Sequence, residues 1–457
     1  MNSNPWHKYN PLADKIGKLC FMYCSKKSAL PVRDILNEHN KGFKSEPNYE
    51  TATYNRYSSC NQRSVKAAIN DRLSHILFIT KYTGQKKEHH GRYFIVGYFE
   101  IGWVSEVDGR VAVRANRMCF VPIENAYEIT DTRWKRIAPR SQMPKLGNLR
   151  WATQRIKGQL LEEIINHLDK GNATNDFLYE TARLKSEYNP FKEIPNGRIF
   201  IINVGANTSS QVQSPAFEDG RFEFIPILEH AHLESNKALS YADLRQFNFP
   251  EKPLLDLFSK VAISPADQVH NDPEFITHTF GDNVKQKSNL RDLQSGDFLF
   301  FLARLVPYDF ARFRHEKAFF ALVGYLEIAE DLNDPNSHLF TSPAFEQNAH
   351  FIRWLDNPSS FNNFTIFKGS TNSRRFRYAI HFDRKFVENV PLLKANGSIW
   401  DWNRTTELGV IGSNTRTVRM HIDPKTAIGK QQAEKFWEYI WEVEKWNDVG
   451  KNKIESC

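Results

Sequence analysis

The chain contains the stretch His75-Ile-Leu-Phe-Ile-Thr-Lys-Tyr82, then a basic loop from Gln85 to Arg92, then Tyr93-Phe-Ile-Val-Gly-Tyr-Phe-Glu-Ile101. A second stretch repeats this pattern, and its residues are Asp297-Phe-Leu-Phe-Phe-Leu-Ala-Arg304, a basic loop from Pro307 to Lys317, and Ala318-Phe-Phe-Ala-Leu-Val-Gly-Tyr-Leu-Glu-Ile328. Gly-Tyr-x-Glu-Ile occurs in both. Two apolar runs of strand length joined by a polar loop predict an antiparallel hairpin that is buried on at least one face.

The repetition predicts that the chain holds two β-rich domains with a common ancestral core. Gly97 and Gly324 lie inside the second strand of each hairpin, where glycine indicates a bulge or a close backbone approach. We expect an aromatic-walled cavity to open beside one of these glycines.

The size and composition favour a soluble, cytoplasmic protein. A chain of 457 residues can hold two or three domains with their own cores. Its 5 cysteines form no paired framework, which is typical of a reducing compartment. No segment approaches the ~18 apolar residues that a membrane span needs, and the N-terminus has no apolar core of a secretory signal.

The positive charge is concentrated at the N-terminal end. Residues 1–150 contain 25 Lys and Arg against 13 Asp and Glu, a balance of +12, whereas the remaining residues carry a balance of −4. A basic domain beside a nearly neutral remainder indicates a polyanionic partner that the first domain contacts. A basic surface that serves only solubility is the alternative.

The expected fold class is α+β, with two β-barrel domains, a helical connector and a C-terminal helix. Apolar residues repeat at helical spacing across residues 149–170, and Gly171 follows them. A weaker helix is expected at residues 176–186. The expected boundaries are 1–147 for the basic domain, 148–196 for the connector, 197–393 for the second domain, and 394–457 for a polar loop and the final helix.

The order of strand, helix, hairpin and closing strand resembles the PUA-like superfamily, which includes the EVE, YTH, ASCH and SRA-type domains. Residues 198–390 also resemble a narrower group, the third type of nucleotide-modification-associated domain. The residues that carry this second resemblance are Val204-Gly-Ala-Asn207, Ser214-Pro215, Asp219-Gly220, Phe222-Glu-Phe-Ile-Pro-Ile227, Phe280-Gly-Asp282, Gly296-Asp297 and Lys368-Gly-Ser370.

The resemblance implies a PUA-like β-barrel with a pocket for one modified, flipped base. A base removed from its stack needs aromatic faces around it and hydrogen bonds to its edge. Each candidate aromatic residue could instead belong to a core. The candidates are Tyr54, Tyr57, Tyr98 and Trp103 in the first domain, and Phe280, Tyr308, Tyr325 and Trp354 in the second.

Two basic groups are candidates for phosphate contacts. The first, at the tip of the N-terminal hairpin, suits a nucleic-acid backbone, although exposed tips are often basic for solubility alone. The second surrounds Gly369, which permits close approach of a phosphate, but charge guarding an edge strand is the alternative. The residues are Lys86, Lys87 and Arg92 in the first group, and Lys368, Ser370, Arg374 and Arg375 in the second.

Catalytic residues are less clearly indicated. Asn207, Asp219, His278 and Asp282 lie in loops beside expected strands, where function is often located. Asp219-Gly220 is also an ordinary turn signal, and His278 with Asp282 is either an acid–base pair or a solvated pair. The sequence lacks a Walker loop and the GxSxG, HExxH, CxxC and HxxxH patterns, so we expect no metal and no cofactor.

The sequence therefore predicts a nucleic-acid-binding protein that recognises a modified base, with DNA favoured over RNA, as part of a modification or defence system. An enzyme that modifies a base or nucleotide through the 197–393 domain is the main alternative. A protein-interaction scaffold is the third, since the Trp-rich final helix offers a surface for a protein partner.

Overall fold

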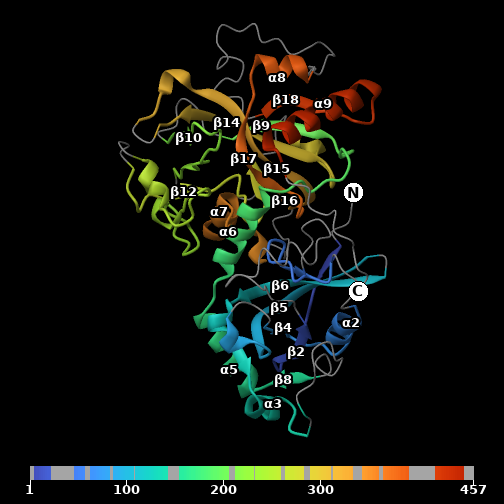
Figure 1. Ribbon diagram of the computed structural model, residues 1–457. Helices are drawn as coiled ribbons and strands as arrows, with labels where there is room; N and C mark the ends of the chain where they lie inside the picture. The colour runs from blue at the N-terminus through green and yellow to red at the C-terminus, as the bar shows by residue number, and fades with distance from the viewer. Residues whose placement is uncertain are drawn as a thin grey trace. The chain divides into compact units, whose positions relative to one another are not determined.

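The computed structural model places the described residues in two compact units (Figure 1). Unit 1 is built from the chain up to Leu184, and unit 2 from most of the chain after it. No helix among the described residues is long and apolar enough to cross a bilayer. The described residues are 5–21, 46–56, 62–82, 86–107, 109–140, 142, 154–204, 212–230, 232–258, 263–282, 289–309, 312–332, 342–359, 364–390 and 417–446.

The described part of unit 1 contains one sheet, whose main path has the strand order β3-β6-β5-β4-β2-β8. Strands β1 and β7 also pair with β5. β2 runs parallel to β4, and the other neighbours on the path are antiparallel. The strands are β1 (Trp6–Lys8), β2 (Ile16–Phe21), β3 (Thr53–Tyr54), β4 (His75–Lys81), β5 (Tyr93–Val107), β6 (Arg110–Phe120), β7 (Tyr127–Ile129) and β8 (Arg155–Lys157).

Unit 2 has the same arrangement in its order β13-β16-β15-β14-β9-β18. β9 runs parallel to β14, as β2 does to β4, and the remaining neighbours are again antiparallel. β10 and β17 add to this sheet, while β11 and β12 form a separate pair. The strands are β9 (Ile199–Asn203), β10 (Ser214–Ala216), β11 (Ile227–Leu228), β12 (Val269–His270), β13 (Thr279–Asp282), β14 (Phe298–Pro307), β15 (Phe319–Leu332), β16 (Thr365–Gly369), β17 (Arg374–His381) and β18 (Thr417–Ile422).

The duplicated hairpin is present in both units with the same irregularity. Phe78 lies opposite Gly97 and Phe301 lies opposite Gly324. In each hairpin the register shifts by one residue immediately beyond this pair, so the β-bulge occupies the same place. The structure is a mixed α/β fold with several sheets. Within the described residues the strand paths are open and do not close into the barrels that the sequence predicts.

A second repeat leads into β3 and β13 and includes the first two residues of each strand. Pro47-Asn-Tyr-Glu-Thr-Ala-Thr-Tyr54 and Pro273-Glu-Phe-Ile-Thr-His-Thr-Phe280 share the pattern Pro-x-aromatic-x-Thr-x-Thr-aromatic, and the peptide bond before each proline is cis. Ala52 and His278 occupy the same place in the two loops, with left-handed φ values of 53° and 59°. We call these segments the acid–proline loops, because Glu46 precedes the first and Asp272 the second.

Aromatic rings from the acid–proline loops fill the space beside the two hairpin glycines. A Cβ atom on Gly97 would lie 2.7 Å from the Tyr49 hydroxyl, and one on Gly324 would lie 2.6 Å from the Phe275 ring. The glycines therefore permit a close approach of ring to strand. Side chains occupy the place where we expected a cavity.

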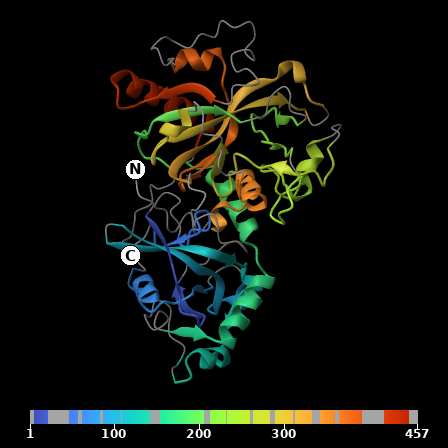
Figure 2. The same cartoon turned by 180° about the vertical axis from the view of Figure 1, so that it is seen from behind.

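A helix after the last strand of each main path packs against the sheet (Figures 1 and 2). α5 (Gln159–Lys170) follows β8 and buries Leu161, Ile164 and Leu168 with the core of unit 1. α9 (Ala427–Glu444) follows β18 and buries Phe436, Trp437 and Ile440. The α5 segment, expected to be part of a connector, therefore contributes to the first core. The other α-helices of the described segments are α2 (Gln62–Asn70), α3 (Asp131–Ile137), α6 (Thr174–Lys185), α7 (Ala349–Asp356) and α8 (Arg384–Asn389).

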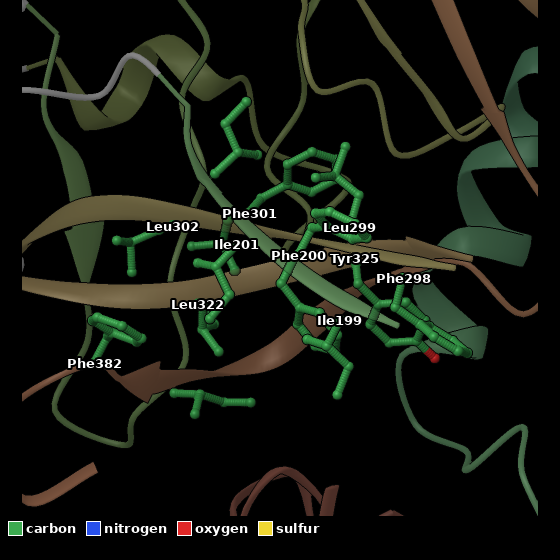
Figure 3. Close-up of a cluster of buried hydrophobic side chains, with 14 of the residues drawn as sticks. Ile199, Phe200, Ile201, Phe298, Leu299, Phe301, Leu302, Leu322, Tyr325 and Phe382 are labelled. Carbon is green, nitrogen blue, oxygen red and sulfur yellow. The ribbon is translucent and has the colours of Figure 1, made fainter. Parts of the chain in front are cut away.

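The core of unit 2 is rich in aromatic rings (Figure 3). β9 and β14 are buried along almost their whole length, which is typical of parallel strands covered on both faces. Phe298 and Tyr325 project from neighbouring strands, with ring centres 5.8 Å apart, and Trp437 of α9 packs edge-on against both. Short 3₁₀ helices occur at η1 (Lys87–His89), η2 (Ile123–Asn125), η3 (Tyr241–Asp243), η4 (Leu254–Leu257), η5 (Asn289–Asp292), η6 (His315–Lys317) and η8 (Pro343–Phe345).

Candidate functional site

A pocket of about 210 Å³ opens in unit 2 at the end of the β14–β15 hairpin. β10 runs parallel to the end of β14, and the Tyr308 amide donates to the Ala216 carbonyl at 2.8 Å. A tight turn follows β10, in which Gly220 has a φ of 86° that favours glycine. The Ala379 amide on β17 donates to the Gly220 carbonyl at 2.9 Å, which attaches this turn to the sheet.

Aromatic side chains form much of the pocket wall. Phe319 and His381 stack face to face, with ring centres 4.0 Å apart and an interplanar angle of 2°. Tyr308 packs near Phe217 and lies 4.7 Å from Phe313 between ring centres. His381 is exposed and Phe319 half-buried, so their rings are accessible at the surface. The lining residues are Ala216, Phe217, Glu218, Gly220, Pro307, Tyr308, Asp309, Arg314, Phe319, Ala379 and His381.

Charged groups accompany these rings. The Arg314 guanidinium donates to Asp309 at 2.9 and 3.2 Å, and these bonds raise the pKa of Arg314. Asp219, in the turn beside the pocket, accepts from the Arg221 side chain at 2.7 Å. Burial opposes ionisation of Asp219, but the bonds from Arg221 outweigh it and lower the pKa of this carboxyl. The pocket thus combines flat apolar walls with donors and acceptors at its edge.

Most described base-pocket candidates lie in the two cores. Tyr54, Tyr98, Trp103, Phe280 and Tyr325 are each at most 5% exposed. The rings of Tyr54, Phe280 and Tyr325 pack on other core rings, and the Tyr98 hydroxyl donates to Asp169 at 2.7 Å. Trp354 is half-buried on α7, Tyr308 lines the pocket, and Tyr57 lies outside the described residues.

The second group of phosphate candidates makes internal contacts. Lys368 donates to the Thr277 carbonyl, and Ser370 donates to Glu327. Arg374 donates to the Lys185 carbonyl at 3.0 Å. Arg375 donates to Glu223 at 3.1 Å. These bonds occupy the cationic groups that we expected to meet phosphate.

The first group of phosphate candidates, at the hairpin tip of unit 1, is more accessible than the second group. Lys87 is exposed, Lys86 forms an ion pair with Glu124, and Arg92 lies 3.4 Å from Glu128. Ion pairs between exposed groups are weak and screened by salt, so these cations can still contact a polyanion.

The expected catalytic residues do not converge on one place. His278 is buried and its Nε2 lies 3.0 Å from Lys185 Nζ, whereas Asp282 is buried at the end of β13. Asp219 lies beside the aromatic pocket, and Asn207 lies outside the described residues.

One cluster that the sequence analysis missed has the chemistry of a metal site. His270, Asp272 and His350 bring one ligand atom each to within 4.8 Å of one another. They are separated by up to 80 residues, and only the fold brings them together. Burial raises the pKa of Asp272 to about 7. Burial favours the neutral form of Glu229 beside them, but hydrogen bonds from His270 and Arg353 outweigh it and lower its pKa to about 2.

The fold and pocket define a duplicated α/β protein whose second unit carries a small aromatic-walled site. The family model for nucleotide modification associated domain 3 matches residues 198–426, from β9 to the residue before α9. This range is half of the chain, and the chain belongs to this family. No curated protein and no solved structure matches the chain.

Proposed function

We propose that this protein binds nucleic acid, with DNA favoured over RNA, and recognises a modified base that is flipped into the pocket beside Tyr308. The observation that carries the proposal is the pocket itself. Its volume of about 210 Å³ is below the roughly 300–1,000 Å³ of pockets for drug-sized ligands. One planar ring system suits this volume, and stacking on aromatic faces is how an unstacked base is held.

The two units take different roles in this proposal. Unit 1 carries the excess of positive charge and the exposed hairpin tip, so it binds the phosphate backbone independently of the base sequence. Unit 2, with the family match, supplies the pocket. The shared strand order supports the descent of both units from one ancestor, and we infer that both are PUA-like domains. Such a protein fits a cytoplasmic modification or defence system.

Fluorescence anisotropy tests the proposal. Oligonucleotides that differ only in one modified base are titrated with the full chain and with His381→Ala, which removes an exposed wall of the pocket. We expect the chain to prefer one modification and His381→Ala to lose at least tenfold of that preference while keeping its affinity for unmodified DNA. His167→Ala, an exposed histidine on α5, is the control. Equal affinity for every base in the wild type would contradict the proposal.

An enzyme that alters a base or nucleotide is the second candidate, favoured by the histidine–aspartate cluster of unit 2. Mass spectrometry of nucleosides after incubation with the full chain distinguishes the two: a reader leaves each nucleoside unchanged, and an enzyme produces a new one.

A further inference from the structure

One distance in the cluster of His270, Asp272 and His350 suits a shared ion better than a direct hydrogen bond. His350 Nε2 lies 3.4 Å from Asp272 Oδ2. A charge-assisted hydrogen bond between such groups is shorter, at about 2.7–2.9 Å. Two ligand atoms bound to one tetrahedral ion at about 2.1 Å lie about 3.4 Å apart. The distance between these two atoms therefore matches the distance between two ligand atoms bound to one tetrahedral ion.

A buried carboxylate orients His270. Glu229 Oε2 lies 3.0 Å from His270 Nδ1, and the Glu229 side chain is 0% exposed. Arg353, one turn beyond His350 on α7, donates to both oxygens of the same carboxylate at 2.5 and 3.1 Å. With Nδ1 held by Glu229, Nε2 is the atom of His270 that can coordinate. A carboxylate behind a histidine is the usual support of a metal ligand.

Asp272 is held with one oxygen toward the histidines. Its Oδ1 accepts from the Gly281 amide at 2.9 Å and from Asn348 Nδ2 at 2.8 Å, which leaves Oδ2 facing His350. Gly281 also makes room for the ring, because a Cβ there would lie 2.5 Å from a carbon of His350. The ligands are thus positioned by two strands, one loop and one helix.

A comparison of the two units shows which part of the cluster supports the fold in both units and which part belongs to unit 2. Glu46 accepts from the Asn55 amide at 2.6 Å, just as Asp272 accepts from Gly281. The acid of the acid–proline loop therefore has a structural role in both units. His350 comes from a segment that only unit 2 has at this point, since β5 and β6 are separated by two residues while α7 lies between β15 and β16.

We propose that His270, Asp272 and His350 bind one divalent transition-metal ion of the Zn²⁺ class. Two imidazoles and one carboxylate favour such ions over Mg²⁺ and Ca²⁺, which prefer oxygen ligands. The side chains of His270 and His350 are 14% and 15% exposed, so an ion can reach them. Three protein ligands leave a position for water or for an oxygen or nitrogen of a nucleotide, as in catalytic zinc sites.

Metal titration of the chelator-treated full chain tests this site. Zn²⁺ binding is measured by calorimetry, and Co²⁺ binding by the visible absorption of the bound ion. We expect saturation at one ion per chain. Asp272→Asn, which keeps an oxygen for the Gly281 amide, and His350→Ala should each weaken binding more than tenfold. Glu229→Gln, a change in a positioning residue, should weaken it by roughly 10–100-fold.

His167→Ala is the control and should bind as the wild type does. Circular dichroism checks that each variant is folded. If His350→Ala does not fold, the metal affinity of Asp272→Asn tests the site. Absence of saturable binding in the wild type would overturn the proposal, as would equal affinity in the wild type and Asp272→Asn. Base recognition at the Tyr308 pocket uses other residues, so each proposal can fail without the other.

Discussion

Gly324 lies directly against Phe275: the Cβ atom that Gly324 lacks would fall 2.6 Å from the Phe275 ring. Gly97 has the same relation to Tyr49, the equivalent aromatic residue of the other acid–proline loop. In both units a ring from a loop far away in sequence covers the bulge of the central hairpin. This contact joins the two repeated motifs into one structural unit.

Gly324→Ala should therefore destabilise unit 2 by about 1–3 kcal/mol, the usual cost of an extra methyl group in a packed core. The added Cβ would also lie 2.6 Å from the Arg374 carbonyl oxygen, which cannot move as a side chain can. Urea denaturation measures the change. Lys385→Ala, at an exposed position of α8, is the control and should change the free energy of unfolding by no more than about 0.5 kcal/mol. Equal costs would contradict the account.

Arg375 should matter for stability and not for nucleic-acid affinity. It is 5% exposed, donates to Glu223, and packs 4.0 Å from the ring centre of Phe247. Arg375→Met removes the cation beside the buried Glu223 and leaves this carboxylate only its hydrogen bonds from Phe247 and Asn248. Breaking a buried ion pair in this way typically costs about 3–5 kcal/mol. The neighbouring, half-buried Arg377→Met is the control. If Arg375→Met is stable but binds DNA more weakly, Arg375 contacts phosphate, as the sequence predicts.

The stability of unit 2 should depend on pH through Glu444, at the end of α9. Burial raises its pKa to about 7 from an ordinary value of 4.5, although it accepts hydrogen bonds from the Arg377 and Tyr378 amides. Between these two values the folded chain holds a proton that the unfolded chain releases. The free energy of unfolding should therefore fall as pH rises, by at most about 1.4 kcal/mol per pH unit.

Glu444→Gln should remove this dependence, because glutamine does not titrate. Chemical denaturation at several pH values across the window compares the two proteins. Parallel curves for wild type and Glu444→Gln would show that Glu444 does not contribute.

The exposed hairpin tip of unit 1 should contribute to affinity without regard to base. Lys87→Glu should weaken binding to all oligonucleotides alike and reduce the slope of log affinity against log salt by about 1, the effect of one lost phosphate contact. Lys385→Glu, on an exposed position of α8, is the matched control. Unchanged affinity in Lys87→Glu would exclude the tip from the interface.

The sequence was sufficient to predict the duplicated hairpins, because the paired apolar runs and the shared Gly-Tyr-x-Glu-Ile appear in consecutive residues. The acid–proline repeat carries a signal of the same kind, Pro-x-aromatic-x-Thr-x-Thr-aromatic, and a search for spaced identities would have found it. The presence of rings beside Gly97 and Gly324 depends on the path of a distant loop. Spacing alone does not report that path.

Candidate site residues were harder to predict for a physical reason. Arg374 and Arg375 have the composition of a phosphate site, but β17 directs them into the core, where carbonyls and Glu223 bind them. His270 and Asp272 are close in sequence, but His350 is distant from both, and only the packing of α7 near β12 brings it to them. Tyr308 was named from its type and loop position, and the structure places it at a pocket.

Calorimetry with free nucleosides measures base recognition by the Tyr308 pocket alone, because a nucleoside lacks the backbone that unit 1 would hold. The full chain is titrated with unmodified and modified nucleosides, in parallel with His381→Ala and His167→Ala. We expect saturable binding of one modified nucleoside by wild type and His167→Ala, and a loss of at least tenfold in affinity for His381→Ala. Binding that His381→Ala leaves unchanged, or no binding of any nucleoside, would contradict the proposed base recognition.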